Sequence, residues 1–360
     1  MDGQKLRKLV LEDGSTYIGT GFGSGVDKVC EIVFNTAMIG YQEVISNPSC
    51  TYAAVVMTYP LIGNYGIADE DYETKIPTLG ALIVRDYNDN PSNFRYTKTL
   101  SEVMEENGIP GISGIDTRKL TRYIRDNGSC KVLITDADTP QEEAMATLAN
   151  TEIPRDAVAQ VSCKKRWYSR TANAKYNVVA VDCGIKQNII RCLNDRSCNV
   201  TIVPYTTSFE EIERMHPDGV VISNGPGNPE DVPQVETLVG QLRGKYPLLG
   251  ISLGHLLICR AYGAKTYKMK RGHNGGHPVK NVITGKVTAT AQGHGYAVDE
   301  ASLAGAGLTL THVDVLDGTV EGVACAEDRV ISLQFHPESA PGAQDCMFLF
   351  DEFIKLMEVK

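Results

Sequence analysis

Short apolar runs separated by polar, glycine-rich turns dominate the second half of the chain. The runs NVVAVD, NVTIVP, DGVVIS and PLLGIS follow residue 176 in turn, and amphipathic segments lie between them. Such runs are typical of strands buried on both faces, and their alternation with helical segments is typical of βαβ units. The pattern predicts an α/β domain over residues 177–360, with a mostly parallel sheet flanked by helices.

The first 150 residues follow a different pattern, in which strands alternate with turns. Apolar residues on both sides of the turn EDGS predict a hairpin at 9–18. A helix is expected after Asp116, an N-cap residue, and it should end at Gly128. Further strands are expected at 29–34, 53–58 and 81–84. We therefore predict a β-rich α/β domain over residues 1–150.

The regular pattern of apolar runs and turns is lost between the two halves of the chain. Residues 151–176 are polar and basic apart from the only tryptophan, Trp167. Such a composition favours a linker between the two predicted domains.

The composition of the chain limits the kinds of molecule that it is expected to bind. The 360 residues are 42% hydrophobic and carry a net charge of -9, so a large core is expected and nucleic acid is not an expected partner. No stretch is apolar enough for a signal peptide or a membrane span, and a cytoplasmic location is the expectation. The ten cysteines form no C-x-x-C pair, which argues against a zinc site.

Unusual residues follow three of the predicted strands. The turn NGPGNP at 224–229 follows DGVVIS, Ser252 follows PLLGI, and His336 and Glu338 follow VISLQF. In parallel sheets the chemistry lies at the carboxyl ends of the strands. We therefore expect these three segments to lie at one edge of the sheet.

The stretch GISLGH at 250–255 has the pattern of a nucleophile elbow, a sharp turn from strand to helix that exposes a serine. Alternatively, the motif only begins a buried helix. The pair His336 and Glu338 favours the catalytic interpretation over a chance surface pair. Residues two apart on an extended segment share one side, so the carboxylate can orient the imidazole.

Other motifs carry less weight. The turn Gly225-Pro226-Gly227 can bring backbone N–H groups close to a ligand, although alone it is only a tight turn. The glycines at 19–23 follow a hairpin strand and open no helix, so no dinucleotide site is expected, and no phosphate loop occurs. His273 and His277 have metal-like spacing without an obvious third ligand, and no metal site is predicted.

Taken together, these motifs resemble a known family. The order of NGPGNP, GISLGH and HPE (336–338) resembles that in class I glutamine amidotransferase domains. The whole chain resembles the small subunits of carbamoyl phosphate synthetase, through NTAMIGYQEVISNPS at 35–49, TYPLIGNYG at 58–66, SNFR at 92–95, DTRKLTR at 116–122, AKTYKMKRGH at 264–273 and HPESAPG at 336–342.

The resemblance implies a glutaminase. In that family the chain hydrolyses L-glutamine, and the ammonia passes through a tunnel to a large subunit. The large subunit uses bicarbonate, ATP and Mg²⁺ to make carbamoyl phosphate for arginine and pyrimidine biosynthesis. The resemblance thus implies a heterodimer with that subunit and no cofactor in this chain.

The resemblance also assigns residues. Ser252 stands where the family has its cysteine nucleophile, His336 corresponds to the base and acid, and Glu338 to the residue that orients it. The N–H of Leu253 would serve the oxyanion hole. The expected glutamine-binding set is Ser49, Gly225, Gly227, Leu253, Leu256, Gly293, Gly295 and Tyr296.

Several positions depart from the family pattern. Besides Ser252, Leu256 replaces a glutamine, Gly293 replaces an asparagine, and the asparagine usual between Gly276 and His277 is absent. A serine hydroxyl must lose its proton during attack, whereas a cysteine in such a site is largely thiolate. We therefore expect a glutaminase rate lower by roughly 10³ to 10⁶.

Alternative interpretations remain open. The serine is either a substitution introduced to trap glutamine or a natural loss, and the gathering of changes at one site favours natural loss. The chain could be a non-hydrolysing structural or regulatory partner of an ammonia-dependent synthetase. A serine hydrolase of the α/β type would need an acid between Ser252 and His336, whereas Glu338 follows the histidine.

Overall fold

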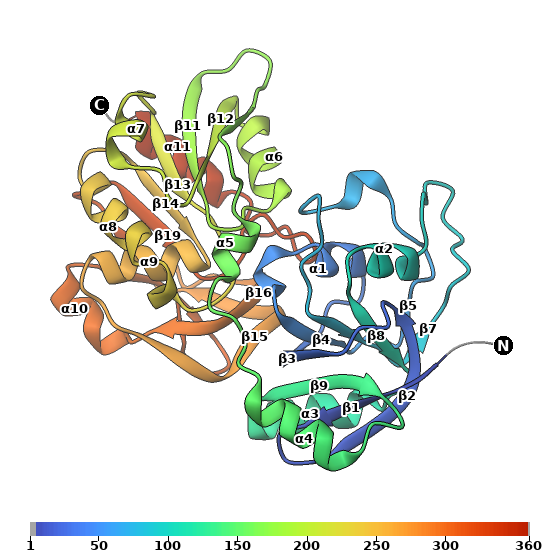
Figure 1. The fold of residues 1–360 in the computed structure, drawn as a ribbon. Helices are drawn as coiled ribbons and strands as arrows, with labels where there is room; N and C mark the ends of the chain where they lie inside the picture. Colours follow the sequence, from blue (N-terminus) through green and yellow to red (C-terminus); the bar gives the residue numbers. More distant parts are fainter. Residues whose placement is uncertain (1–4, 359–360) are drawn as a thin grey trace. The chain divides into compact units, whose positions relative to one another are not determined.

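The computed structural model describes residues 5–358, and its internal contacts divide the chain into two compact units (Figure 1). The N-terminal unit comprises Met1–Pro154 and Lys270–Asn274, and the C-terminal unit comprises Arg155–Met269 and Gly275–Lys360. Within the described range, none of the helices has the length and apolar character needed to cross a membrane.

The N-terminal unit is a closed barrel in which β1, β2, β8, β6, β4, β3 and β9 are neighbours in that order. The predicted hairpin is confirmed, because β1 and β2 pair antiparallel with Val10 opposite Thr16. The other predicted strands are confirmed as β3, β4 and β6, which pair parallel. The barrel strands are β1 (Leu6–Leu11), β2 (Thr16–Gly23), β3 (Lys28–Asn35), β4 (Ala53–Met57), β6 (Ala81–Ile83), β8 (Pro110–Ser113) and β9 (Lys131–Asp136).

Helices and short strands complete this unit. The helix predicted after Asp116 is confirmed as α3: the Asp116 carboxylate accepts a hydrogen bond from Lys119 N at 2.9 Å, and the chain leaves the helix at Gly128 with φ 100°. The remaining elements are α1 (Tyr41–Ile45), η1 (Pro48–Cys50), β5 (Leu61–Ile62), η2 (Asp69–Asp71), β7 (Asp86–Tyr87), α2 (Leu100–Glu106), α3 (Thr117–Asn127) and α4 (Gln141–Asn150).

A ten-stranded sheet forms the C-terminal unit, in the order β10-β12-β11-β13-β14-β19-β18-β17-β15-β16. The predicted parallel sheet is confirmed for β12, β11, β13, β14 and β19, whereas β10, β18 and β17 join antiparallel. The strands are β10 (Trp167–Ser169), β11 (Tyr176–Asp182), β12 (Cys198–Pro204), β13 (Gly219–Ile222), β14 (Leu248–Ile251), β15 (Thr266–Asn281), β16 (Val287–Val298), β17 (Thr309–Asp314), β18 (Val320–Cys325) and β19 (Val330–Leu333).

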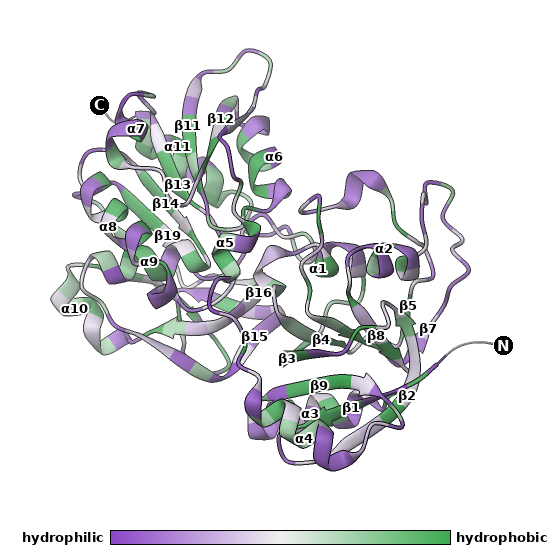
Figure 2. Cartoon of the chain, viewed as in Figure 1, coloured by the Kyte–Doolittle hydropathy of each residue, from purple (hydrophilic) through white to green (hydrophobic). Residues whose placement is uncertain are grey.

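Helices cover both faces of the parallel strands, as expected for strands that are apolar throughout (Figure 2). Val178 and Ala180 of β11 face α6 and α11, whereas Val179 and Val181 face the core that contains α8 and α9. The remaining elements are α5 (Ala157–Val161), α6 (Gln187–Asp195), α7 (Phe209–Glu213), η3 (Pro229–Asp231), α8 (Pro233–Leu242), α9 (Leu253–Ala261), η4 (Glu300–Ser302), α10 (Leu303–Ala306) and α11 (Leu349–Glu358).

The segment 151–176, predicted as a linker, contains α5 and β10. Strand β10 pairs antiparallel with β12 at the sheet edge, with Trp167 opposite Ile202. Only three residues long and largely exposed, β10 has no apolar alternation that a sequence pattern could reveal.

Candidate active site

Ser252 occupies the sharp turn between β14 and α9. Its φ of 55° and ψ of -108° place a non-glycine residue in a conformation that costs about 1–3 kcal/mol. The two flanking positions have no room for a side chain. A Cβ at Gly250 would lie 2.8 Å from the Gly254 carbonyl oxygen, and one at Gly254 would lie 2.0 Å from the Ile222 oxygen. The turn therefore has the geometry of a nucleophile elbow.

Neighbouring strand ends hold this elbow in place. Ser252 N donates to the Leu333 oxygen at 2.8 Å, and Gly254 N donates to the Ser223 oxygen at 3.1 Å. The elbow is thus fixed between the carboxyl ends of β19 and β13. Ser252 itself is 2% exposed and lies at the N-terminus of α9, where backbone N–H groups favour negative charge.

His336 and Glu338 lie beyond the end of β19 and form a buried pair. His336 Nδ1 is 2.8 Å from Glu338 Oε1, and His336 N donates to the Ala291 oxygen of β16 at 2.8 Å. An ionised Glu338 makes Nδ1 the donor and leaves Nε2 able to accept a proton. Among the described residues Nε2 has no hydrogen-bond partner, so the Ser252 hydroxyl does not donate to it in this conformation.

Lys186 completes the arrangement, and the sequence interpretation missed it. Its buried ammonium lies 2.9 Å from Glu338 Oε1 and also donates to the Ser339 carbonyl oxygen. Burial by itself would raise the pKa of Glu338, but the charge of Lys186 and the contact with His336 lower that pKa to about 2. Glu338 is therefore a permanently charged partner of the imidazole at neutral pH.

A signal for Lys186 was present in the sequence. It follows the predicted strand NVVAVD by four residues and so lies near the carboxyl end of β11, where functional residues of parallel sheets gather. Nothing local connects it to Glu338, which is 152 residues away.

The predicted glutamine-binding residues come from several elements. Gly225 and Gly227 follow β13; a Cβ at Gly225 would lie 2.3 Å from the Cys183 oxygen, and Gly227 has φ 89°. The other positions of the C-terminal unit are Leu253 and Leu256 in α9 and Gly293, Gly295 and Tyr296 in β16. Ser49 belongs to the N-terminal unit and lies in η1, where its N–H donates to the Asn47 side chain.

The two leucines of this set are each 2% exposed and pack in the core under α9. At position 256 this means that an apolar side chain takes the place where the family resemblance expects a polar amide.

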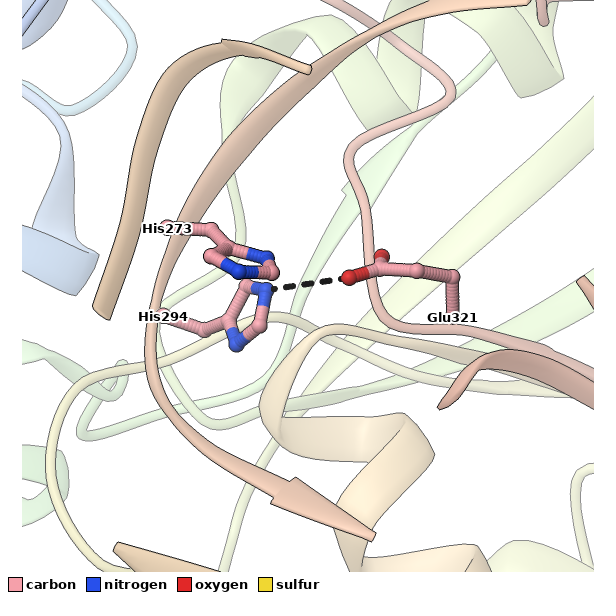
Figure 3. Close-up of side chains that lie close together, drawn as sticks. All are labelled: His273, His294 and Glu321. Atoms are coloured by element: carbon pink, nitrogen blue, oxygen red, sulfur yellow. Dashed lines mark ion pairs between the residues drawn. The ribbon is translucent and has the colours of Figure 1, made fainter. Parts of the chain in front are cut away.

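Two further acid–imidazole pairs lie elsewhere in the C-terminal unit. His294 Nδ1 lies 2.8 Å from the Tyr296 oxygen, and its Nε2 lies 3.6 Å from Glu321 Oε1, towards which the ring points in Figure 3. His277 Nδ1 is 2.9 Å from Asp314 Oδ2. The sequence interpretation did not foresee either acid.

The pKa values of two further buried histidines indicate how the stability of the protein depends on pH. Burial lowers the pKa of His255 to about 3 and that of His312 to about 4. Both rings stay neutral in the folded state, whereas the unfolded chain binds protons below about pH 6.5. The free energy of unfolding should be highest above pH 6.5 and lower by about 4 kcal/mol at pH 5, measured by urea denaturation. A flat profile between pH 7.5 and 5 would contradict this.

Models of two known protein families match this chain, one in each unit. The model of the family "Glutamine amidotransferase class-I" matches residues 179–356, and that of "Carbamoyl-phosphate synthase small chain, CPSase domain" matches residues 9–134.

Similar curated proteins cover almost the whole chain. A carbamoyl phosphate synthase small chain of Staphylococcus saprophyticus is 50% identical over 98% of this chain and 96% of its own length. One of Listeria innocua is 48% identical over 98% of this chain and 97% of its own length. One of Bacillus caldolyticus is 48% identical over 98% and 96%. This identity over nearly the full length shows that the chain belongs to the family of carbamoyl phosphate synthase small chains.

Proposed function

We propose that this chain is the amidotransferase subunit of a carbamoyl phosphate synthase in which hydrolysis of glutamine is strongly impaired. The observation that carries the proposal is an elbow after β14 that bears a serine hydroxyl at the nucleophile position. A buried His336–Glu338–Lys186 relay lies beyond the end of the adjacent strand β19. The geometry suits acyl transfer, whereas the serine hydroxyl at position 252 is a poor nucleophile for that reaction.

The roles of the residues follow from their positions. The nucleophile at 252 attacks the carbon of the glutamine side-chain amide as His336 Nε2 takes its proton. Glu338 stabilises the imidazolium, and the N–H of Leu253 at the start of α9 faces the developing oxyanion. The imidazolium returns the proton to the leaving ammonia. Water, deprotonated by the same imidazole, then releases glutamate from the enzyme.

Serine weakens the first step. A thiol beside a histidine and a helix N-terminus ionises near neutral pH, whereas a hydroxyl stays protonated until attack. Among the described residues His336 Nε2 accepts no hydrogen bond, so no general base is yet engaged with the hydroxyl.

Leu256 and Gly293 are expected to weaken glutamine binding, because neither side chain can donate or accept a hydrogen bond. In a Ser252→Cys background, adding Leu256→Gln and Gly293→Asn should lower KM for glutamine by about fivefold or more, from net gains of about 0.5–1.5 kcal/mol per hydrogen bond. Steady-state glutamate release measures this. An unchanged or higher KM in a folded variant would contradict the assignment of these positions.

The proposed partner is the large subunit, which would bind ATP and Mg²⁺ and supply carbamoyl phosphate for arginine and pyrimidine biosynthesis. The test is carbamoyl phosphate formation by the reconstituted pair with ammonia or with glutamine as nitrogen donor. We expect synthesis with ammonia and a rate with glutamine lower by about 10³ or more. Equal rates with both donors would refute impairment, and failure of the chains to associate would refute the subunit assignment.

A serine hydrolase is the weaker alternative. In the structure the acid that orients His336 is Glu338, two residues after it, and no acid between the elbow and the histidine is required. Stoichiometric labelling of Ser252 by a fluorophosphonate would favour the hydrolase over the amidotransferase.

A further inference from the structure

A basic pocket lies in the N-terminal unit, whereas the residues of the catalytic relay belong to the C-terminal unit. Its volume is about 610 Å³, and four arginines line it: Arg85, Arg118, Arg122 and Arg125. A concentration of positive charge in a chain with a net charge of -9 calls for a physical reason, because neighbouring guanidinium groups repel one another.

The fold places three of the arginines on one side of α3. Residues 118, 122 and 125 follow helical spacing, while Leu120 and Ile124 on the opposite side are buried in the barrel core. The anchored apolar face fixes the direction of the arginine face. Arg85 reaches the same pocket from the segment after β6, where its carbonyl oxygen accepts a hydrogen bond from Gly114 N.

Most of the arginines in this pocket have no direct ion-pair partner, although the Asp116 carboxylate also lines it. The Arg125 guanidinium donates two hydrogen bonds to the carboxylate of its neighbour Asp126, at 2.8 and 3.2 Å. Arg85, Arg118 and Arg122 make no ion pair or side-chain hydrogen bond with any residue that the structure describes. The guanidinium groups of these three arginines can therefore donate hydrogen bonds to a ligand in the pocket.

Two further features suit an anion. The pocket borders the first turn of α3, where the helix dipole favours negative charge, and the Asp116 carboxylate at this turn is engaged with Lys119 N. Thr121 also lines it, and its hydroxyl is buried without a hydrogen-bond partner among the described residues. A buried hydroxyl without a partner is costly unless a ligand or water satisfies it.

We propose that this pocket binds a small multivalent oxyanion of the phosphate class. Planar guanidinium forks match the oxygen spacing of phosphate groups. The described lining contains no aromatic side chain, so the pocket recognises the phosphate groups and has no surface on which a base would stack. The site is independent of glutamine hydrolysis and goes beyond the proposed function.

The test is isothermal titration of the full-length chain with inorganic pyrophosphate and with inorganic phosphate, in the absence of glutamine. We expect both to bind, pyrophosphate more tightly, with affinity falling as salt rises. The variant R118Q/R122Q should bind pyrophosphate at least tenfold more weakly. Its matched control is R155Q/R166Q, which removes the same charge from exposed arginines of the C-terminal unit and should leave the affinity unchanged.

Three results would overturn the proposal. One is the absence of pyrophosphate binding at millimolar concentration to the wild-type chain. Another is an equal loss of affinity in both double variants, provided that circular dichroism shows both to be folded. The third is tighter binding of an oligoglutamate peptide than of pyrophosphate at the same salt concentration, which would identify the pocket as a docking site for an acidic protein segment.

Discussion

Ser252→Cys is expected to raise the rate of glutamate release from glutamine by about 10³-fold or more. The backbone of the elbow, with its positive φ and the two hydrogen bonds to Leu333 and Ser223, is already formed around the serine. The substitution changes only the nucleophilic atom, and a thiolate at the N-terminus of α9 would be stabilised by the helix dipole and by His336. The gain should appear in kcat, because the pocket residues are unchanged.

The control is the same substitution combined with His336→Ala. Without the imidazole, the thiol loses its base and the leaving ammonia loses its acid, so the gain should largely disappear. Ser92→Cys, on an exposed loop of the N-terminal unit, adds a thiol elsewhere and should leave the rate at its basal value. A Ser252→Cys variant with unchanged glutamate release would refute the assignment of position 252.

Lys186→Met should destabilise the protein by about 3–5 kcal/mol, because it leaves the fully buried carboxylate of Glu338 without its charge partner. Urea denaturation at pH 7 measures the loss. In the Ser252→Cys background, burial would then raise the pKa of Glu338, so the acid limb of the pH–rate profile should move to higher pH.

Lys355→Met provides the matched control. Lys355 pairs with Glu352 at 2.7 Å on the surface of α11, with 65% and 44% of the two side chains exposed. An exposed pair contributes about 0–1 kcal/mol, and the control should therefore change stability little and leave the pH–rate profile in place. Equal effects of the two substitutions would show that Lys186 has no special role in the relay.

Local patterns predicted the elements of the fold but not how distant elements close on one another. The strands of the parallel sheet were predictable because runs such as DGVVIS are apolar on both faces. Closure of the barrel depends on the pairing of β1 with β9, which brings Leu9 opposite Ile134. No local pattern specifies that register, and the same holds for the antiparallel strands β17 and β18.

The same limit applies to the site. The strain at Ser252 was predictable because glycines flank it, and the His336–Glu338 contact was predictable because residues two apart share one side of an extended segment. Lys186 links the segment after β11 to the segment after β19, and the pair of His294 and Glu321 links β16 to β18. Their roles depend on strand order, which the sequence pattern of a single chain does not specify.

We propose that the elbow can present a nucleophile to glutamine but carries a serine oxygen where the family has a cysteine sulfur. The most direct test is reaction of the wild-type chain and the Ser252→Cys variant with a diazoketone analogue of glutamine, followed by mass spectrometry of the labelled peptide. We expect stoichiometric labelling at position 252 in the variant, protection by excess glutamine, and no labelling of Ser252 in the wild type on the same timescale. Equal labelling of Ser252 in the wild type, or labelling of the variant at any other cysteine instead, would contradict the claim.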